Sequence, residues 1–216
     1  MIISLCNLKG GAGKTTTAVN IAVYLAHKGL NVCVIDADVD QQSATIWGTQ
    51  RPENVPQVDV FPISKKGFID KVRGYEKKYD VLIVDAPPRL AGITDTILEI
   101  TDLLIFPVKP SPFDLWAFED FLEKVDEFIQ EDGLPVYGVF TEFDSTEHRE
   151  QKLDKSFKSA FDKYDIPVIA KIKKRQTHKS IMAYGLGSYE STNKKAKREM
   201  QDLGSKTLSL IKQLQK

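Results

Sequence analysis

The sequence predicts an α/β fold that is doubly wound, with a mostly parallel sheet and helices on both faces. Three observations carry this prediction. Short apolar runs alternate with helical stretches along the 216 residues, as in chains where a crossover helix follows each parallel strand. Residues 80–85 place four consecutive aliphatic residues between two aspartates, which is typical of a central strand buried on both faces. A glycine-rich turn separates the first strand from the first helix.

The elements follow in chain order. Residues 2–7 predict the first strand, and residues 14–27 predict the first helix, which Gly29 ends. Further strands are expected over residues 31–36, 58–61, 80–85, 102–108, 135–141 and 168–170. Further helices are expected over residues 66–77, 114–131, 147–164, 179–184 and 193–215. No composition break divides the chain, so residues 1–216 are expected to form a single domain without an N-terminal helix-turn-helix extension.

Composition favours an ordinary globular protein. No apolar run approaches the roughly 18 residues of a membrane span. Strand-like residues follow Met1 at once, which argues against a signal peptide and for a cytoplasmic protein. Cys6 and Cys33 lie in apolar strand-like runs and are expected to be reduced core thiols. The histidines have no metal-ligand spacing, so structural or surface roles are expected for them.

The segment after the first strand is rich in glycine and reads Asn7-Leu8-Lys9-Gly10-Gly11-Ala12-Gly13-Lys14-Thr15-Thr16. Such a turn lets successive backbone N–H groups point at phosphate oxygens, and the following helix adds the positive end of its dipole. Lys14 supplies a point charge for the β- and γ-phosphates of a nucleotide, and the Thr15 hydroxyl is a magnesium ligand. The general P-loop consensus would place its first glycine at Leu8, and a second lysine, Lys9, follows it.

The pattern K-G-G-x-G-K-T-T resembles the signature of the ParA/MinD family of deviant Walker A (SIMIBI-type) P-loop ATPases. Over nearly its full length, the chain most resembles small plasmid-partition ParA proteins (ParF-like) and carboxysome-positioning (McdA-like) relatives. The resemblance implies that ATP and Mg²⁺ bind at Lys9 to Thr16 and that two subunits sandwich two ATP molecules. It further implies that Lys9 reaches across to the partner's nucleotide, so that Lys9, Lys14 and Asp38 are the expected catalytic residues.

Acidic residues end the strand expected at residues 31–36. Because ligands of parallel sheets bind beyond the carboxyl ends of the strands, these acids are expected near the phosphates. By resemblance, Asp36 helps to hold the magnesium shell and Asp38 positions or activates the attacking water. Alternatively, one of them caps the next helix. The family run D-x-D-P-Q is replaced here by Asp36-Ala37-Asp38-Val39-Asp40-Gln41-Gln42, which leaves open the role of Asp40 and the identity of the matching glutamine.

Asp85 ends the strand of residues 80–85 and precedes Ala86-Pro87-Pro88. A hydrophobic strand followed by an acid is the Walker B pattern, in which the acid binds magnesium, usually through a water molecule. The form D-A-P-P matches the ParA/MinD family. The expected metal residues are therefore Thr15, Asp36 and Asp85, and residues 86–94 are expected to respond to loss of the γ-phosphate.

A second segment that resembles the family follows the strand of residues 102–108 and reads Pro107-Val108-Lys109-Pro110-Ser111-Pro112-Phe113-Asp114. Its three prolines make a stiff loop. In small partition ATPases the similar P-x-x-P-S-P-x-D segment borders the nucleotide and the dimer interface, so Pro110 and Pro112 are expected near the nucleotide. The alternative is a rigid connector that caps a helix with Asp114.

Charge is unevenly distributed, although the formal net charge is zero. Residues 171–216 carry twelve Lys or Arg and three Asp or Glu, a net charge of +9, against −9 for residues 1–170. This asymmetry indicates a polyanionic partner, with a solvated helical face as the alternative. The resemblance to partition ATPases implies binding to DNA without sequence preference. The expected DNA-binding residues are Lys171, Lys173, Lys174, Arg175, Lys179, Lys194, Lys195, Lys197 and Arg198.

Together these features predict a cytoplasmic, nucleoid-associated ATPase that dimerises on ATP, with higher assemblies left open, and binds non-specific DNA. Hydrolysis, stimulated by a ParB-like or McdB-like adaptor, would release it. The cargo would be a plasmid, a chromosome or a protein organelle such as a carboxysome. One alternative is a MinD-like membrane-associated regulator, because Leu208, Leu210, Ile211 and Leu214 could form an amphipathic anchor. The other alternative is a P-loop kinase or synthase on the same fold.

Overall fold

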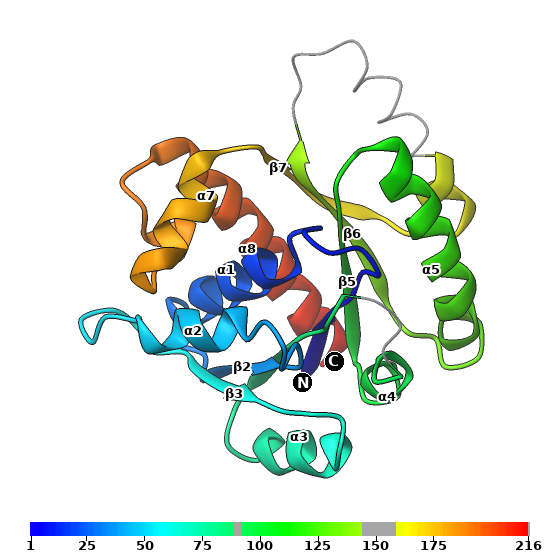
Figure 1. Ribbon diagram of the computed structural model, residues 1–216, viewed down its shortest axis with the longest axis horizontal. Helices are drawn as coiled ribbons and strands as arrows, with labels where there is room; N and C mark the ends of the chain where they lie inside the picture. The colour runs from blue at the N-terminus through cyan, green and yellow to red at the C-terminus, as the bar shows by residue number, and fades with distance from the viewer. Residues whose placement is uncertain (89–91, 144–158, 216) are drawn as a thin grey trace.

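The computed structural model describes residues 1–88, 92–143 and 159–215, and only the backbone of residues 112–115 and 117. Its strands are β1 (Ile2–Leu5), β2 (Val32–Asp36), β3 (Asp59–Pro62), β4 (Val81–Asp85), β5 (Leu103–Val108), β6 (Val136–Phe143) and β7 (Val168–Lys173). They form one sheet in the order β3-β2-β4-β1-β5-β6-β7, and every pairing is parallel (Figure 1). The predicted doubly wound α/β fold is confirmed.

Helices cover both faces of the sheet (Figure 1). The elements are α1 (Lys14–Ala26), α2 (Ser43–Thr49), α3 (Phe68–Glu76), α4 (Thr94–Leu98), α5 (Pro112–Gln130), α7 (Gln176–Ser180) and α8 (Lys194–Leu214), with 3₁₀ turns η1 (Ile181–Tyr184) and η2 (Ser188–Glu190). Helices α1 and α8 pack together on one face, and α3, α4 and α5 lie on the other (Figure 1). The inner strands β2, β4 and β5 therefore bury side chains in both directions, which explains their apolar sequences.

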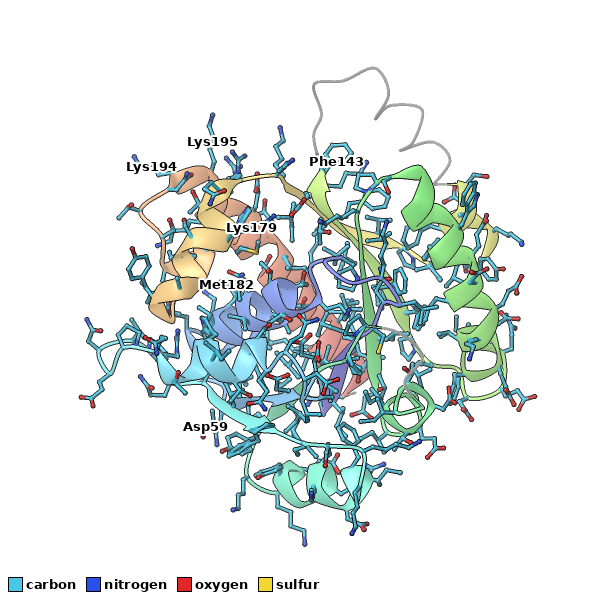
Figure 2. All side chains as sticks on the ribbon, in the orientation of Figure 1. Asp59, Phe143, Lys179, Met182, Lys194 and Lys195 are labelled. Atoms are coloured by element: carbon cyan, nitrogen blue, oxygen red, sulfur yellow. The ribbon has the colours of Figure 1, made fainter. Side chains whose placement is uncertain are left out.

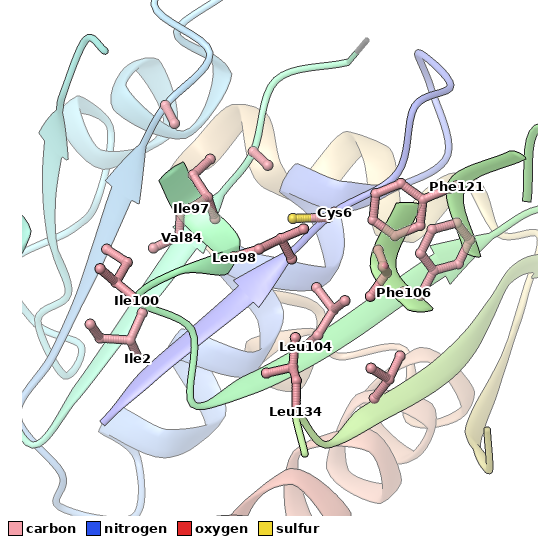
Figure 3. Packing of buried hydrophobic residues seen from close by; sticks show 14 of the residues in the cluster. Ile2, Cys6, Val84, Ile97, Leu98, Ile100, Leu104, Phe106, Phe121 and Leu134 are labelled. Atoms are coloured by element: carbon pink, nitrogen blue, oxygen red, sulfur yellow. The ribbon is translucent and has the colours of Figure 1, made fainter. Parts of the chain in front are cut away.

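Two hydrophobic clusters, one on each face, hold the layers together. Figure 3 shows part of the first cluster, in which Leu104 and Phe106 of β5 meet Phe121 of α5. The second joins alternate residues of the same strands to α1 and α8. Cys6 and Cys33 are free, buried thiols, as predicted, and burial raises the pKa of each to about 12.

The C-terminal helix α8 buries its apolar stripe in the second cluster. Met200, Leu203 and Ile211 of this helix are almost fully buried, and Leu208 and Leu210 pack partly against the same cluster. Leu214, at the end of the helix, is 44% exposed. An anchor that lies in a membrane surface must expose such a stripe. The contacts therefore favour the packed helix over the amphipathic anchor. Among the described residues, no helix combines the length and apolarity needed to cross a bilayer.

Several element boundaries differ from those expected. Helices α2 and α4 were not predicted, and β7 continues to Lys173, three residues beyond its expected end. The helix expected over residues 179–184 is divided between α7 and η1. Residues 159–163 are helical, whereas most of the helix expected over residues 147–164 lies outside the described residues.

The contact between α8 and α1 at Gly204 yields a stability prediction. A Cβ atom on Gly204 would clash with Cγ of Tyr24 on α1, so the packing between the two helices would have to change. Gly204→Ala is expected to lower the free energy of unfolding by about 1–3 kcal/mol, because overpacking displaces a core helix. Gly74→Ala is the matched control, since Gly74 on α3 has no atom within 4 Å of the added Cβ, and its stability should be equal or greater. Urea unfolding of both variants measures the difference, and equal effects would contradict the packing argument.

Candidate functional site

The loop between β1 and α1 has a backbone that only glycine adopts easily. Gly11 has φ +74° and Gly13 has φ +92°, both in the left-handed region. Gly13 immediately precedes α1 and faces Thr141, whose Cγ2 would lie 3.1 Å from an added Cβ. A side chain at Gly13 would therefore strain the backbone and crowd β6. The loop leads directly into the N-terminus of α1, where unpaired backbone N–H groups favour an anion.

Side chains outside the glycines fix this loop to the sheet. Asn7 donates from Nδ2 to the Pro107 carbonyl at 2.6 Å and accepts the Lys9 backbone N–H through Oδ1 at 2.8 Å. The Thr141 hydroxyl donates to the Ala12 carbonyl at 2.7 Å. The loop is thus tied to β5 on one side and to β6 on the other, so its shape is set before any ligand arrives.

Lys14 lies inside the loop. Its ammonium donates to the carbonyls of Asn7 at 3.2 Å and of Lys9 at 3.4 Å, and the residue is only 6 % exposed. Burial lowers the pKa of Lys14, although the nearby carboxylates of Asp85 and Asp38 act in the opposite direction. A buried ammonium held by two carbonyls favours the approach of an anion, which would supply the missing opposite charge.

Two acids stand side by side at the ends of neighbouring strands, because Asp36 of β2 pairs in register with Asp85 of β4. Asp85 is 1 % exposed, and neither of its carboxylate oxygens has a hydrogen-bond partner among the described residues. Burial raises the pKa of Asp85 to about 7. The nearby Thr15 side chain lowers this pKa, although it lies too far from the carboxylate or at too poor an angle for a hydrogen bond. A buried carboxylate without partners is costly, which indicates that it serves a ligand.

Asp36 is bonded differently. Its Oδ2 accepts the Thr45 backbone N–H at 2.8 Å and the Thr45 hydroxyl at 2.9 Å, and its Oδ1 accepts the Asp38 N–H at 3.3 Å. Asp36 therefore holds the first turn of α2 against the end of β2. This resembles the helix-capping role that the sequence analysis gave as the alternative. Burial raises its pKa, and the bonds from Thr45 oppose the rise. These bonds give Asp36 a structural role beside the magnesium role expected for it.

A cavity of about 390 Å³ lies over the loop and extends toward α7 and η1. The predicted residues that line it are Gly10, Gly11, Gly13, Lys14, Thr15, Thr16 and Asp38. Asp38 also accepts the Gln41 N–H through Oδ1 at 3.3 Å, and Gln41 lines the cavity beside it. Gln42 instead precedes α2, so Gln41 is the glutamine that faces the site. Asp40 lies exposed in the intervening turn.

The proline-rich segment reaches the cavity through Lys109. Pro110 is half-buried in the bend after β5, and Pro112 is the first residue of α5, a position that suits proline. The side chains of Pro112 and Asp114 lie outside the described part of the chain. Lys109, which the sequence analysis did not single out, lines the cavity together with Glu142 and Met182. The position of Lys109 and Glu142 at or just after strand ends is the signal that could have identified them.

The residues present fit magnesium bound with a phosphate. Thr15 offers a hydroxyl and Asp85 a carboxylate, the hard oxygen ligands that Mg²⁺ prefers. No cluster of three or more His, Cys, Asp or Glu residues in the described ranges is arranged to hold a metal unaided. A magnesium ion that takes only one or two protein ligands and completes its shell with phosphate and water is compatible with this arrangement.

Comparison with known proteins assigns the family. A model described as "CobQ/CobB/MinD/ParA nucleotide binding domain" matches residues 3–188. The chain belongs to this family. The matched range contains the phosphate loop, both acids at the ends of β2 and β4, and the cavity residues from β6 and α7. The resemblance to the ParA/MinD family that the motifs indicated is therefore confirmed.

Individual relatives place the chain within the family. It is 26% identical over 194 residues to the "Maintenance of carboxysome distribution protein A" of Halothiobacillus neapolitanus, covering 87% of this chain and 86% of that protein. It is 30% identical over 128 residues to "Protein ParA" of Rhizobium radiobacter, but this covers only 58% of the chain and 56% of the relative. The septum site-determining protein MinD of Pyrococcus horikoshii, solved with Mg-ADP, matches with a TM-score of 0.78 at 17% identity over 97% and 96% of the two chains, which supports the shared fold.

The contrast between Asp85 and Asp36 gives a prediction. Asp85→Asn is expected to raise the free energy of unfolding at pH 8 by about 1–2 kcal/mol in the absence of nucleotide. The reason is that it removes a buried charge without hydrogen-bond partners in the described part of the chain. Asp36→Asn, at the paired position in β2, should lower stability, because an amide cannot accept all the bonds from Thr45 and Asp38. Urea unfolding measures both changes. A loss of stability in Asp85→Asn equal to that in Asp36→Asn would refute the distinction.

Proposed function

We propose that this chain is a Mg²⁺-dependent ATPase of the ParA type that dimerises around ATP, binds DNA without sequence preference and leaves DNA after hydrolysis. The observation that carries the proposal is the different placement of the two lysines of the phosphate loop. Lys14 is buried in the loop and lines the cavity. Lys9 is half-buried and does not belong to the described wall of that cavity. A second lysine placed outside its own site is suited to the nucleotide of a partner subunit.

Each residue of the proposed hydrolytic site has a separate role. Backbone N–H groups of residues 10–15 and Lys14 bind the phosphates, and Thr15 and Asp85 hold Mg²⁺, with Asp36 fixing the neighbouring strand end. The metal would neutralise charge on the phosphates. Asp38, which lines the cavity, orients the attacking water. Lys9 of the partner subunit would complete the charge at the transferred phosphoryl group.

Exposed apolar residues support a dimer that closes over the cavity mouth. Val39 is 38% exposed, Ile46 60% and Tyr184 69%. Val39 adjoins Asp38, and Tyr184 ends the η1 turn. The same turn contains the cavity residue Met182, which Figure 2 labels. Large apolar side chains that remain exposed around a ligand site are typical of an interface. We propose that ATP brings two such faces together.

The proposed DNA surface includes fewer residues than the sequence analysis expected. Lys174, Lys194, Lys195, Lys197 and Arg198 are exposed, and Figure 2 shows Lys194 and Lys195 projecting from the start of α8 into solvent. These residues follow β7 or lie in the first turns of α8, so they could contact neighbouring phosphates of one duplex. A dimer would present two such surfaces.

Several expected DNA contacts have partners within the chain, and even the exposed Lys197 lies 5.2 Å from the centre of the Tyr189 ring. Arg175 binds Glu199 through a 2.6 Å contact, and Lys171 lies 5.1 Å from the centre of the Phe143 ring. Lys179 pairs with Glu142 at 2.7 Å on the cavity wall. Lys173 is exposed on β7. We therefore place Arg175 and Lys179, which form ion pairs, outside the proposed DNA surface, and keep the exposed Lys171 and Lys173 at its edge.

The cellular role follows from the same scheme. An adaptor protein of the ParB or McdB kind would bind the cargo and stimulate hydrolysis, so that the ATPase cycles on and off nucleoid DNA in the cytoplasm. The relative named for carboxysome distribution and the relatives named ParA and Soj support cargo positioning or DNA partition. The buried stripe of α8 gives the MinD-like membrane alternative no support.

Asp38→Ala tests the hydrolytic cycle. The variant should bind Mg·ATP with unchanged affinity but turn it over at least about a hundredfold more slowly, because the attacking water loses its partner. It should accumulate as an ATP-bound dimer in multi-angle light scattering. Lys14→Ala is the control that should bind no ATP and stay monomeric. Wild-type turnover by Asp38→Ala would exclude Asp38 as the water-orienting residue, and unchanged ATP binding by Lys14→Ala would overturn the proposed site.

A charge-removal pair tests the DNA surface. Replacing Lys174, Lys194 and Lys195 with Gln should abolish ATP-dependent binding to a random-sequence duplex at about 0.15 M salt, since fewer phosphates are neutralised. ATP turnover without DNA should not change. Replacing Lys66, Lys71 and Lys77 with Gln removes the same charge from exposed positions in and beside α3 and is expected to leave DNA binding intact. Equal losses in both triple variants would mean that binding follows net charge rather than this surface.

A further inference from the structure

A carboxylate joins two lysines on the wall of the nucleotide cavity. Glu142, at the end of β6, contacts Lys109 through Oε2 at 3.2 Å and Lys179 through Oε1 at 2.7 Å. Lys109 follows β5 and Lys179 lies on α7, so the three side chains come from separate elements. All three line the cavity that contains Lys14 and Asp38. The proposed ATPase mechanism leaves this group, the Glu142 bridge, without a role.

The backbone of β6 is irregular at this point. Glu142 has φ +51°, in the left-handed region that side chains other than glycine avoid. The pairing register between β6 and β7 shifts between Phe140 and Phe143, as it does at a β-bulge. Bulges redirect a side chain at the cost of regular pairing, and such strain persists where the surrounding structure holds it in place. The bulge thus places Glu142 on the cavity wall.

Lys109 lies over the middle of the phosphate loop. Its Nζ would be 3.9 Å from a Cβ atom on Gly11, the residue with φ +74° in that loop. Its side chain is 31% exposed, so the ammonium is partly removed from water. A cation in this position faces the same space as the backbone N–H groups and Lys14. A polyphosphate in the loop would therefore approach Lys109 as well.

The Glu142 carboxylate is an anion in the absence of nucleotide. Burial raises its pKa, but the hydrogen bonds from Lys179 and Lys109 outweigh burial and hold the pKa below its ordinary value. A fixed negative charge beside a phosphate site repels the ligand. Its two lysine partners offset this charge only while they remain bound to it.

We propose that Lys109 is a further phosphate-binding residue of the nucleotide site and that Glu142 is its positioning residue. In the nucleotide-free chain Glu142 keeps Lys109 beside Gly11 and pairs with its ammonium in place of a phosphate. When a nucleotide binds, Lys109 leaves Glu142 and pairs with the polyphosphate, while Lys179 continues to pair with Glu142. Glu142 therefore limits nucleotide affinity through Lys109. This inference rests on the proposed nucleotide site and deepens it.

The test is a double-mutant cycle on nucleotide binding, measured by calorimetric titration with Mg·ATP and Mg·ADP. Lys109→Met should weaken ATP binding about tenfold, the effect of one lost charge-assisted contact. Glu142→Gln should strengthen ATP binding by at least about threefold, because Lys109 no longer has to leave a carboxylate. In the double variant, at least half of the gain from Glu142→Gln, on a logarithmic scale, should disappear. Unchanged affinity in Lys109→Met, or an equal gain from Glu142→Gln in both backgrounds, would overturn the inference.

Two controls separate this result from a structural effect. Lys71→Met and Glu76→Gln change the same charges on α3, where Glu76 pairs with Arg73 at 3.0 Å, and neither should alter ATP affinity. If Lys109→Met lowers the Tm without nucleotide, the ATP affinity of Lys109→Arg distinguishes the two explanations, because this variant keeps the positive charge. Affinity near that of the wild type would then support the phosphate role, and a tenfold loss would overturn it.

The inference can fail separately from the proposed function. If the wild-type chain bound no Mg·ATP, both the proposed function and the role of Lys109 would be refuted. A wild-type chain that binds Mg·ATP and loses it in Lys14→Ala, while Lys109→Met binds normally, would retain the nucleotide site and remove only the role of Lys109.

Discussion

The parallel register of the central strands is the constraint on which the site depends. Because Leu5 of β1 pairs with Asp85 of β4, and Asp85 pairs with Asp36 of β2, the strand that enters the phosphate loop and both acids end at one edge of the sheet. A shift of one residue in this pairing would turn each acid into the opposite hydrophobic cluster, since successive side chains point to opposite faces. The buried aliphatic residues on both faces prevent such a shift.

The nucleotide-free site holds several energetically unfavourable features. In the described part of the chain it contains a buried ammonium bonded only to carbonyls, a buried carboxylate without hydrogen-bond partners and a non-glycine residue, Glu142, in a left-handed conformation. Each of these features costs free energy in the nucleotide-free chain. The two hydrophobic clusters and the anchors at Asn7 and Thr141 hold the arrangement in place. A site of this kind is preorganised for a charged ligand that removes the imbalance.

Ion pairs at the C-terminal end serve two purposes. Glu199 of α8 binds Arg175 and also His178, whose other ring nitrogen meets the buried Ser188 hydroxyl at 2.8 Å. This cluster fixes α7 against α8, so Arg175 and His178 are structural. The lysines at the start of α8 remain exposed to solvent. The same basic segment therefore supplies internal pairs and a solvent-facing positive surface.

The sequence by itself determined the fold class, the family and the types of residue at the phosphate site. These depend on local patterns: the apolar strands, the glycines that a left-handed loop requires, and acids placed directly at strand ends. It did not reveal α2, because Gln42 gives no cap signal and Gly48 disfavours a helix. Tertiary contact forms this helix, since Trp47 is buried and Gly48 lies against Val60 of β3.

Only the tertiary structure decided the partners of the charged residues. Spacing in the sequence cannot show that Arg175 meets Glu199, that Asp36 meets Thr45, or that Glu142 joins Lys109 and Lys179. Apart from Asp36 and Thr45, these partners lie 24 or more residues apart and come together through sheet order and helix packing. Charge is a property of a residue, whereas an ion pair is a property of the fold, and the latter decides whether a lysine faces solvent, a carboxylate or a phosphate.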